Sequence, residues 1–117
     1  MDIFQLSQLS AEQGRSGRQY LEFLRVPSLS AGLYVLPAGW IDAQDPHTED
    51  EVYYVVRGQG RVQVGSEDEA VEPGKTVFVK ALVPHRFHTI TEELRLLVFF
   101  APAEGSAAAA KRVSQPG

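Results

Sequence analysis

The sequence contains no cysteine. A disulfide framework, a zinc site made of thiolates and a cysteine nucleophile are therefore excluded. A chain without cysteine also fits the reducing environment of the cytosol. Any metal site in this protein must be built from the imidazoles of histidine and from oxygen ligands.

Long apolar runs and clustered positive charge are also missing. No stretch approaches the roughly 20 apolar residues that a membrane helix requires, and Asp2 stands where a signal peptide would carry a basic residue. The formal net charge is −4, and the lysines and arginines form no basic stripe, which argues against a nucleic-acid surface. We expect a soluble, cytoplasmic protein with neither a membrane nor a nucleic acid as its partner.

What is present is the pattern of a single all-β domain. The 117 residues leave room for one domain, and short apolar or alternating runs broken by Gly, Pro and acidic turns are typical of a β-sandwich or barrel. Ser10 can cap a brief helical turn that stops at Gly14. The predicted strands are 20–26, 31–36, 51–56, 61–64, 76–79, 86–90 and 94–100, with an acidic hairpin tip at 65–69.

The last predicted strand is apolar on both faces. One face carries Leu94, Leu96, Val98 and Phe100, and the other carries Leu97 and Phe99. An antiparallel strand with one solvent-exposed face should alternate between apolar and polar residues. Either a second sheet or a second subunit is therefore expected to cover the Leu97 face.

Three histidines, His47, His85 and His88, are the strongest candidates for chemistry. His47 is followed four residues later by Glu51, a gap of about 13 Å on a straight strand. Ligands of one metal each lie only about 2 Å from it, so a turn at residues 48–50 would have to fold Glu51 back. This spacing is common by chance, and taken alone it is better explained by a surface turn with solvated acids.

Two longer segments resemble the two sequence motifs of the cupin family. In the first, Gly39 and Gly58 enclose Asp45, His47 and Glu51 at the spacing of the motif's glycines, histidine pair and glutamate. In the second, residues 74–89, Gly74 and His85 stand at the places of the glycine and the histidine. The resemblance covers roughly residues 35–102, with 15 residues between the motifs. It implies a double-stranded β-helix, the jelly-roll barrel of the cupins.

The resemblance implies that His47, Glu51 and His85 bind one divalent metal ion. Asp45 replaces the first histidine of the first motif, and Thr89 replaces the asparagine of the second. Asp45 is either a fourth, carboxylate ligand or the cap of the turn before Pro46. Two imidazoles and a carboxylate favour Fe(II), with Mn, Ni, Co or Zn as competitors.

Residues that share strand parity with the proposed ligands are candidates for the wall of a pocket. Tyr53 shares parity with Glu51, and Phe87 shares parity with His85. Ordinary core positions are the alternative for both. His88 faces away from His85 and is expected to be a surface or interface histidine.

Two functions remain open from the sequence. The first is a metal-dependent enzyme for a small organic substrate, with an oxygenase, an isomerase or a cyclase as options that the family suggests. The second is a non-catalytic module that binds a small molecule, such as a sensor, in which the metal is optional or absent. In both, residues 1–30 form an N-terminal strand and loop segment on the barrel, residues 31–102 form the barrel, and residues 103–117 form a flexible tail. The apolar residues on both faces of the last predicted strand suggest a homodimer, in line with many small cupins.

Overall fold

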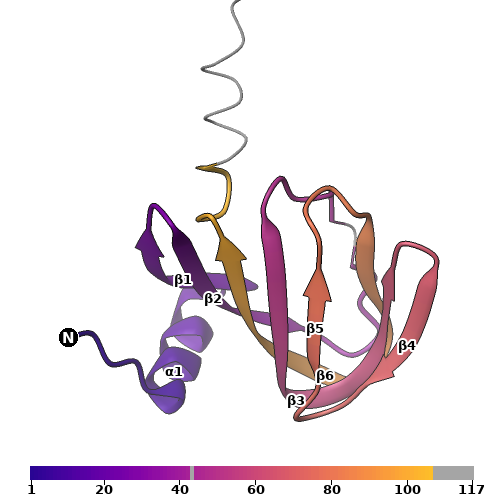
Figure 1. Cartoon of the computed structure of the whole chain (residues 1–117). Coiled ribbons are helices and arrows are strands. Elements are labelled where there is room, and N and C mark those ends of the chain that lie inside the picture. The colour runs from indigo at the N-terminus through magenta and orange to yellow at the C-terminus, as the bar shows by residue number, and fades with distance from the viewer. Residues whose placement is uncertain (43, 107–117) are drawn as a thin grey trace, which may run out of the picture.

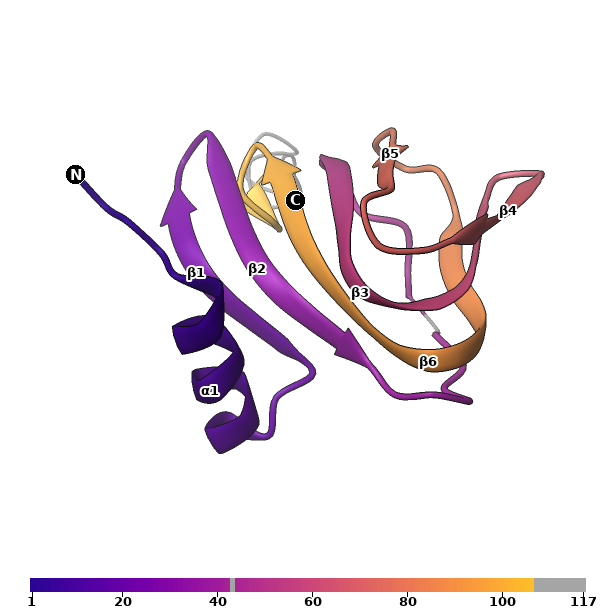
Figure 2. The same ribbon diagram turned by 90° about the horizontal axis from the view of Figure 1, so that it is seen from below.

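The computed structural model describes residues 1–42 and 44–106. The described part contains one helix and six strands: α1 (Leu6–Ser16), β1 (Tyr20–Val26), β2 (Leu29–Leu36), β3 (Asp50–Val64), β4 (Glu67–Val71), β5 (Thr76–Val79) and β6 (His85–Ala101). The strands form an antiparallel sheet in the order β1-β2-β6-β3-β4, and β5 pairs with β3 off this path. Figures 1 and 2 show this sheet curling over, so that β4 and β5 face the end of β6 that begins at His85. The predicted all-β jelly roll is confirmed.

Two long, bent strands produce the curl. β3 has 15 residues and β6 has 17, and each joins two of the runs that the sequence predicts as separate strands. The pairing of β3 with β6 shifts register at three points between Val55 and Arg61. Gly58 lies among these shifts with a φ angle of 98°. The glycines here therefore mark bulges, which bend and twist a strand, and the prediction of separate strands over residues 51–56 and 61–64 is wrong.

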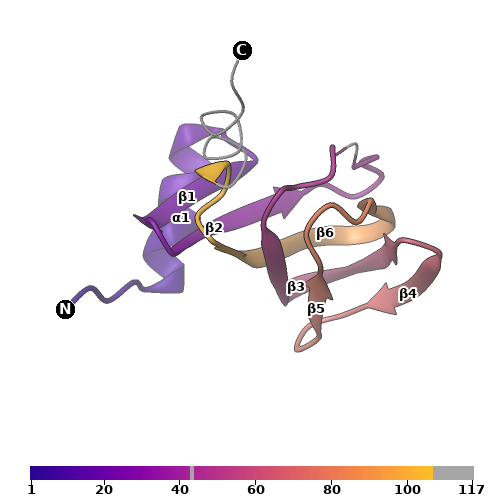
Figure 3. The same cartoon turned by 45° about the horizontal axis from the view of Figure 1, so that its top comes forward.

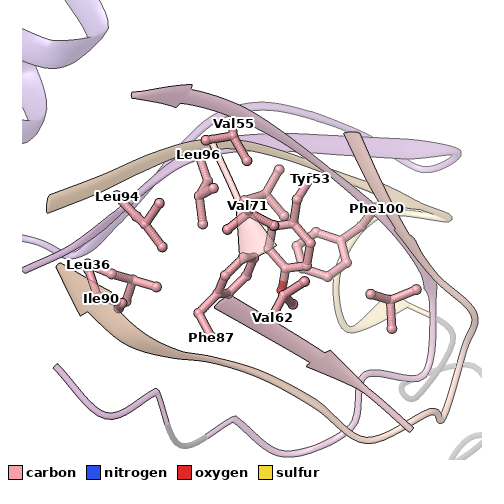
Figure 4. Packing of buried hydrophobic residues seen from close by; sticks show 12 residues of the cluster. Leu36, Tyr53, Val55, Val62, Val71, Phe87, Ile90, Leu94, Leu96 and Phe100 are labelled. Atoms are coloured by element: carbon pink, nitrogen blue, oxygen red, sulfur yellow. The ribbon is translucent and has the colours of Figure 1, made fainter. Parts of the chain in front are cut away.

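The main hydrophobic core fills the space inside the curl, as Figure 4 shows. Alternate residues of β3 and β6, among them Tyr53, Val55, Leu96 and Phe100, point inward because side chains on a strand alternate between faces. Each large apolar side chain buried in this way contributes about 1.5–3 kcal/mol. The core therefore holds the two bent strands in place around the site described below.

The helix α1 covers part of the outer face of the sheet. Leu9 on α1 packs against Leu33 and Val35 of β2, and Leu97 of β6 packs against the same cluster. Figure 3 shows α1 beside β1 and β2, on the side away from β4 and β5. The second apolar face of the last strand is thus covered in part by a helix, which neither of the two sequence-based alternatives included.

The N-terminal helix is longer than the sequence predicts. It starts at Leu6, runs through Ser10 and Gly14, and ends where Gly17 adopts a left-handed conformation with φ 67°. The prediction of a brief turn stopping at Gly14 is therefore wrong, because packing of Leu9 stabilises a helix that propensity alone would not. Among the described residues, no helix combines the length and the apolar character needed to span a membrane.

The chain after β6 begins with a packed segment. Ala103 is buried, and the backbone N–H of Glu104 donates to the hydroxyl oxygen of Ser30 at 2.9 Å. The N–H of Gly105 donates to Glu49 Oε1 at 2.8 Å, which places Glu104 beside the site. The rest of the predicted flexible tail, residues 107–117, lies outside the described residues.

Candidate metal centre and its cavity

Three segments meet at one end of the curled sheet. Glu51, near the start of β3, pairs with Val79 at the end of β5, and a short loop after β5 leads to His85, the first residue of β6. The Leu82 N–H of that loop donates to the backbone oxygen of His47 at 2.7 Å. These contacts bring His47, Glu51 and His85 together. His85 lies far from the other two along the chain, and His47 and Glu51 would lie about 13 Å apart on a straight strand.

The ligand atoms of these three side chains form a compact cluster. One atom each of His47, Glu51 and His85 can be chosen so that all three lie within 4.8 Å of one another. Glu51 and His85 are buried, with exposed fractions of 1% and 5%, and His47 is half-buried. The centroids of the two imidazole rings are 5.4 Å apart. The segment before Glu51 therefore folds back in the way that a shared metal site requires.

The Glu51 carboxylate is the most informative group of the cluster. Both of its oxygens are buried without a hydrogen-bond partner in the described part of the chain. His85 Nε2 lies 3.0 Å from Oε1, but this contact lacks the geometry of a hydrogen bond. A buried carboxylate without hydrogen bonds is costly unless a cation compensates it. The set of two imidazoles and one carboxylate fits a divalent metal ion, and so does the lack of hydrogen bonds to the Glu51 carboxylate.

His85 is oriented so that one nitrogen faces the cluster. Its Nδ1 lies 3.0 Å from the carbonyl oxygen of Val83 and donates to it, which leaves Nε2 near Glu51 and 3.2 Å from the Tyr53 hydroxyl. Burial lowers the pKa of His85, but the Glu51 carboxylate and the Val83 carbonyl outweigh burial and raise it above the usual value. Burial, with Glu51 nearby, also raises the pKa of Tyr53, whose hydroxyl therefore stays protonated.

A cavity of about 150 Å³ adjoins the cluster. This is below the roughly 300 Å³ of pockets that hold drug-sized ligands, so the cavity admits only a small molecule. The residues that line it are Tyr20, Tyr34, Gln44, His47, Glu51, Tyr53, Val98, Phe100 and Glu104. Tyr53 thus lies where the sequence analysis expects it. Phe87 does not line this cavity: it is fully buried and packs edge-on against Tyr53 in the core.

The other residues singled out in the sequence lie outside the cluster. Asp45 is exposed. His88 is directed away from His85, and its Nε2 lies 2.7 Å from Asp68 Oδ2 near the surface. Glu49 is buried at 2% exposure and accepts a hydrogen bond from Gly105, so of the two acids in residues 48–50 only Asp50 is exposed to solvent.

Sequence reasoning missed several residues beside the cluster, among them Asp42, Gln44, Tyr20 and Glu104. Asp42 is buried and accepts hydrogen bonds from the Phe87 N–H and the Tyr34 hydroxyl, each at 3.0 Å. Gln44, which contacts Asp42, lines the cavity together with Tyr20 and Glu104. Only Asp42 and Gln44 stand close to a motif residue in the sequence. Tyr20 and Glu104 come from β1 and the segment after β6, and nothing in their local sequence links them to the motifs.

Glu104 and Tyr20 add polar groups to the cavity. Glu104 Oε2 lies 3.8 Å from His47 Nδ1, and burial raises the pKa of Glu104 although His47 opposes this. The Tyr20 hydroxyl is buried and has no hydrogen-bond partner among the described residues. A Cβ atom on Gly32 would lie 2.3 Å from the Tyr20 ring, so the glycine leaves the space that lets this ring lie against β2.

The fold and the cluster define a small β-barrel protein with a candidate metal centre. The family profile described as "Cupin domain" matches residues 32–100, more than half of the chain. The chain therefore belongs to the cupin family, of the cupin-2 type. The family's histidine and glutamate positions at 47, 51 and 85 are the ones that meet in the cluster.

Three similar proteins agree with this assignment, and none of these three has a name that states a reaction. The uncharacterized protein SCO3923 of Streptomyces coelicolor is 48% identical over 104 residues, which cover 89% of this chain and 99% of the relative. The crystal structure of TT1209 from Thermus thermophilus is 26% identical with a TM-score of 0.72, covering 88% of this chain and 99% of that one. A cupin 2 conserved barrel protein from Rhodopseudomonas palustris has the same fold, at 18% identity, a TM-score of 0.64 and coverage of 74% and 66%.

Proposed function

We propose that the protein binds one divalent metal ion on His47, Glu51 and His85 and acts on or binds a small organic molecule in the adjoining cavity. The observation that carries the proposal is the Glu51 carboxylate, which is 1% exposed, has no hydrogen-bond partner among the described residues and lies beside two imidazoles. Because a buried charge of this kind needs a counter-charge, a cation held between these three groups is the simplest compensation.

The types of ligand limit which metal ions can bind here and which chemistry a bound ion can provide. Imidazole and carboxylate ligands suit Fe, Mn, Ni, Co and Zn. A bound divalent ion of this group can polarise an oxygen of the organic molecule as a Lewis acid. The chain's own part is to orient the ligands, as the Val83 carbonyl does for His85, and to exclude bulk water from Glu51 by burying it.

The residues that line the cavity suit a small, polar and uncharged molecule as its ligand. Its lining offers the Tyr20 hydroxyl as a hydrogen-bond donor and the Glu104 carboxylate as an acceptor. Among the described residues that line it, none is Lys or Arg, which are the usual partners of phosphate and carboxylate groups. A molecule with hydroxyl or carbonyl groups fits this lining better than an anion does. Both a substrate and a ligand that is only sensed would meet this description.

We also propose a homodimer formed through the outer face of β3, β5 and β6. Val52 of β3 pairs with Phe78 of β5 on one side and with Phe99 of β6 on the other, so the three side chains form one row across the sheet. Phe78 is 60% exposed and Tyr54, two residues after Val52, is 41% exposed. The helix α1 covers the neighbouring part of this face but not this row, and a second copy would bury it.

The metal site is tested by the metal content and thermal stability of the purified protein and three variants. Wild type should bind about one ion per chain and be stabilised by about 2.7 kcal/mol when the free metal concentration is 100 times Kd. His47→Ala and His85→Ala should lose most of the metal and the stabilisation while staying folded. His88→Ala is the matched control, because His88 lies on β6 beside Asp68 and outside the cluster, and it should behave as wild type.

Either of two results would contradict the metal site. One is a wild-type protein whose melting temperature does not respond to Mn(II), Fe(II), Co(II), Ni(II) or Zn(II). The other is metal binding that survives both His47→Ala and His85→Ala. The small-molecule cavity would then stand alone as the site of a binding module.

A further inference from the structure

The first histidine position of the cupin motif is held here by Asp45, which is exposed and lies outside the cluster. The residue before it, Gln44, lines the cavity together with His47 and Glu51. We propose that the side-chain oxygen of Gln44, and not Asp45, completes the metal centre as its fourth protein ligand. This inference rests on the proposed function and names a ligand that neither motif assigns.

The hydrogen bonds of Gln44 fix which end of its amide faces the cluster. Gln44 Nε2 donates to Asp42 Oδ2 at 2.5 Å. An ionised carboxylate can only accept hydrogen bonds, so the nitrogen must be the atom on the Asp42 side. The other end of the amide, Oε1, lies 3.1 Å from His47 Nε2 and accepts a hydrogen bond from the Tyr53 hydroxyl at 3.4 Å. The oxygen, which can bind a metal, is therefore turned toward the candidate ligands.

The distances match those between neighbouring ligands of one ion. With bonds of about 2.1 Å, adjacent ligand atoms lie about 3.0 Å apart at a right angle and about 3.4 Å apart in a tetrahedron. Gln44 Oε1 is 3.1 Å from His47 Nε2, and Glu51 Oε1 is 3.0 Å from His85 Nε2. Both pairs thus have the separation that a shared metal would impose.

Asp42 holds Gln44 in this position as part of a buried network. The Asp42 carboxylate is 2% exposed and is itself fixed by the Phe87 N–H and the Tyr34 hydroxyl. Groups that hydrogen-bond a metal ligand in this way orient it and raise its affinity for the metal. Asp42 is therefore a positioning residue for Gln44, and the exposed Asp45 has no comparable partner among the described residues.

A ligand change from imidazole to amide oxygen alters the metal preference. Imidazole suits Zn, Cu, Fe and Ni, whereas carbonyl and carboxylate oxygens suit Mn and other hard ions. Two imidazoles, one carboxylate and one amide oxygen make a harder site than three imidazoles and one carboxylate. The structure thus shifts the preference toward Mn(II), relative to a cupin with the full histidine set.

The test measures Mn(II) and Co(II) affinity by calorimetry for wild type, Gln44→Met and Asp45→Ala, with the melting temperature of each metal-free protein as the folding control. Methionine keeps the length of the side chain and removes the amide oxygen. Gln44→Met should weaken Mn(II) binding by at least about 10-fold and Co(II) binding by less. Asp45→Ala should bind both ions as wild type does.

A second readout separates a ligand from a merely orienting residue. The visible absorption of bound Co(II) reports the number and type of its ligands, and it should change in Gln44→Met but not in Asp45→Ala. Unchanged affinity and absorption in Gln44→Met would overturn the inference while leaving the three-residue site intact. So would a loss of binding in Asp45→Ala, which stays informative even if Gln44→Met fails to fold. A wild-type protein that binds neither ion would overturn the proposed function as well.

Discussion

Asp42 and Asp45 show how differently two carboxylates of one loop can be used. Asp42 is 2% exposed and accepts three hydrogen bonds, from Phe87, Tyr34 and Gln44. Asp45 is exposed, although it is the one that stands in the motif position. The loop between β2 and β3 is therefore fixed through Asp42, and the placement of Gln44 and His47 depends on it.

This contrast gives a prediction at the scale of the residue. Asp42→Ala should lower the free energy of unfolding by about 2 kcal/mol or more, because each buried donor left without an acceptor costs about 1–3 kcal/mol. Asp45→Ala should change it by no more than about 0.5 kcal/mol, as is usual for exposed sites. Urea denaturation of the metal-free proteins measures both values. Equal effects of the two substitutions would mean that the Asp42 network does not stabilise the loop.

At the scale of the element, glycine has opposite roles in α1 and β3. Gly14 lies inside α1, and a Cβ atom added to it would meet nothing within 4 Å. Gly58 lies in the bulged part of β3 with φ 98°, and a Cβ atom there would come within 2.1 Å of the Glu93 backbone oxygen. The bend of β3 that closes the barrel therefore requires glycine, whereas the helix does not.

The same substitution should consequently have opposite effects at the two positions. Gly14→Ala should stabilise the protein by about 0.5–1 kcal/mol, because alanine loses less backbone entropy on entering a helix. Gly58→Ala should destabilise it by at least about 2 kcal/mol, since a left-handed conformation and a backbone clash are combined. Thermal unfolding of the metal-free proteins tests this. A Gly58→Ala variant as stable as wild type would contradict the account of the bend.

At the scale of the whole molecule, the helix α1 covers one part of the outer face of the sheet and leaves another part uncovered. The helix α1 packs on β2, in a cluster that Leu97 of β6 also joins. The row of Val52, Phe78 and Phe99 on the remaining part is left with apolar side chains, and Phe78 is 60% exposed. An apolar row of this kind on a twisted sheet is an ordinary means of association between copies of a chain.

If the homodimer forms through this row, Phe78→Glu should convert it to a monomer, because a charge would be buried at the centre of the interface. Ile41→Glu is the matched control, since Ile41 is 73% exposed but lies in the loop between β2 and β3. Sedimentation equilibrium measures the mass of each protein. A wild-type monomer, or a dimer that survives Phe78→Glu, would contradict this interface.

The class of fold and the three residues of the candidate metal cluster could be predicted from the sequence, through its resemblance to the two cupin motifs. Strand parity is a local property, so it indicates which residues of 51–56, and which of 94–100, share a face of the sheet. The motif spacing located His47, Glu51 and His85 because it reflects a fold that many sequences share. The lengths of β3 and β6 could not be predicted in this way, because a glycine such as Gly58 indicates a turn or a bulge equally well until its partner strand is known.

The surroundings of the three ligands became known only from the folded chain. Whether Asp45 or Gln44 turns inward depends on a loop whose path is set by Asp42 bonding to Phe87, 45 residues away in the chain. Tyr20 and Glu104 reach the cavity from the two ends of the described chain through strand pairing that local patterns do not encode. Burial of α1 on β2 likewise required contacts that exist only once the sheet has formed. The three cluster residues could be predicted because they stand at fixed places in the motifs. Their surroundings could not be predicted, because long-range packing determines them.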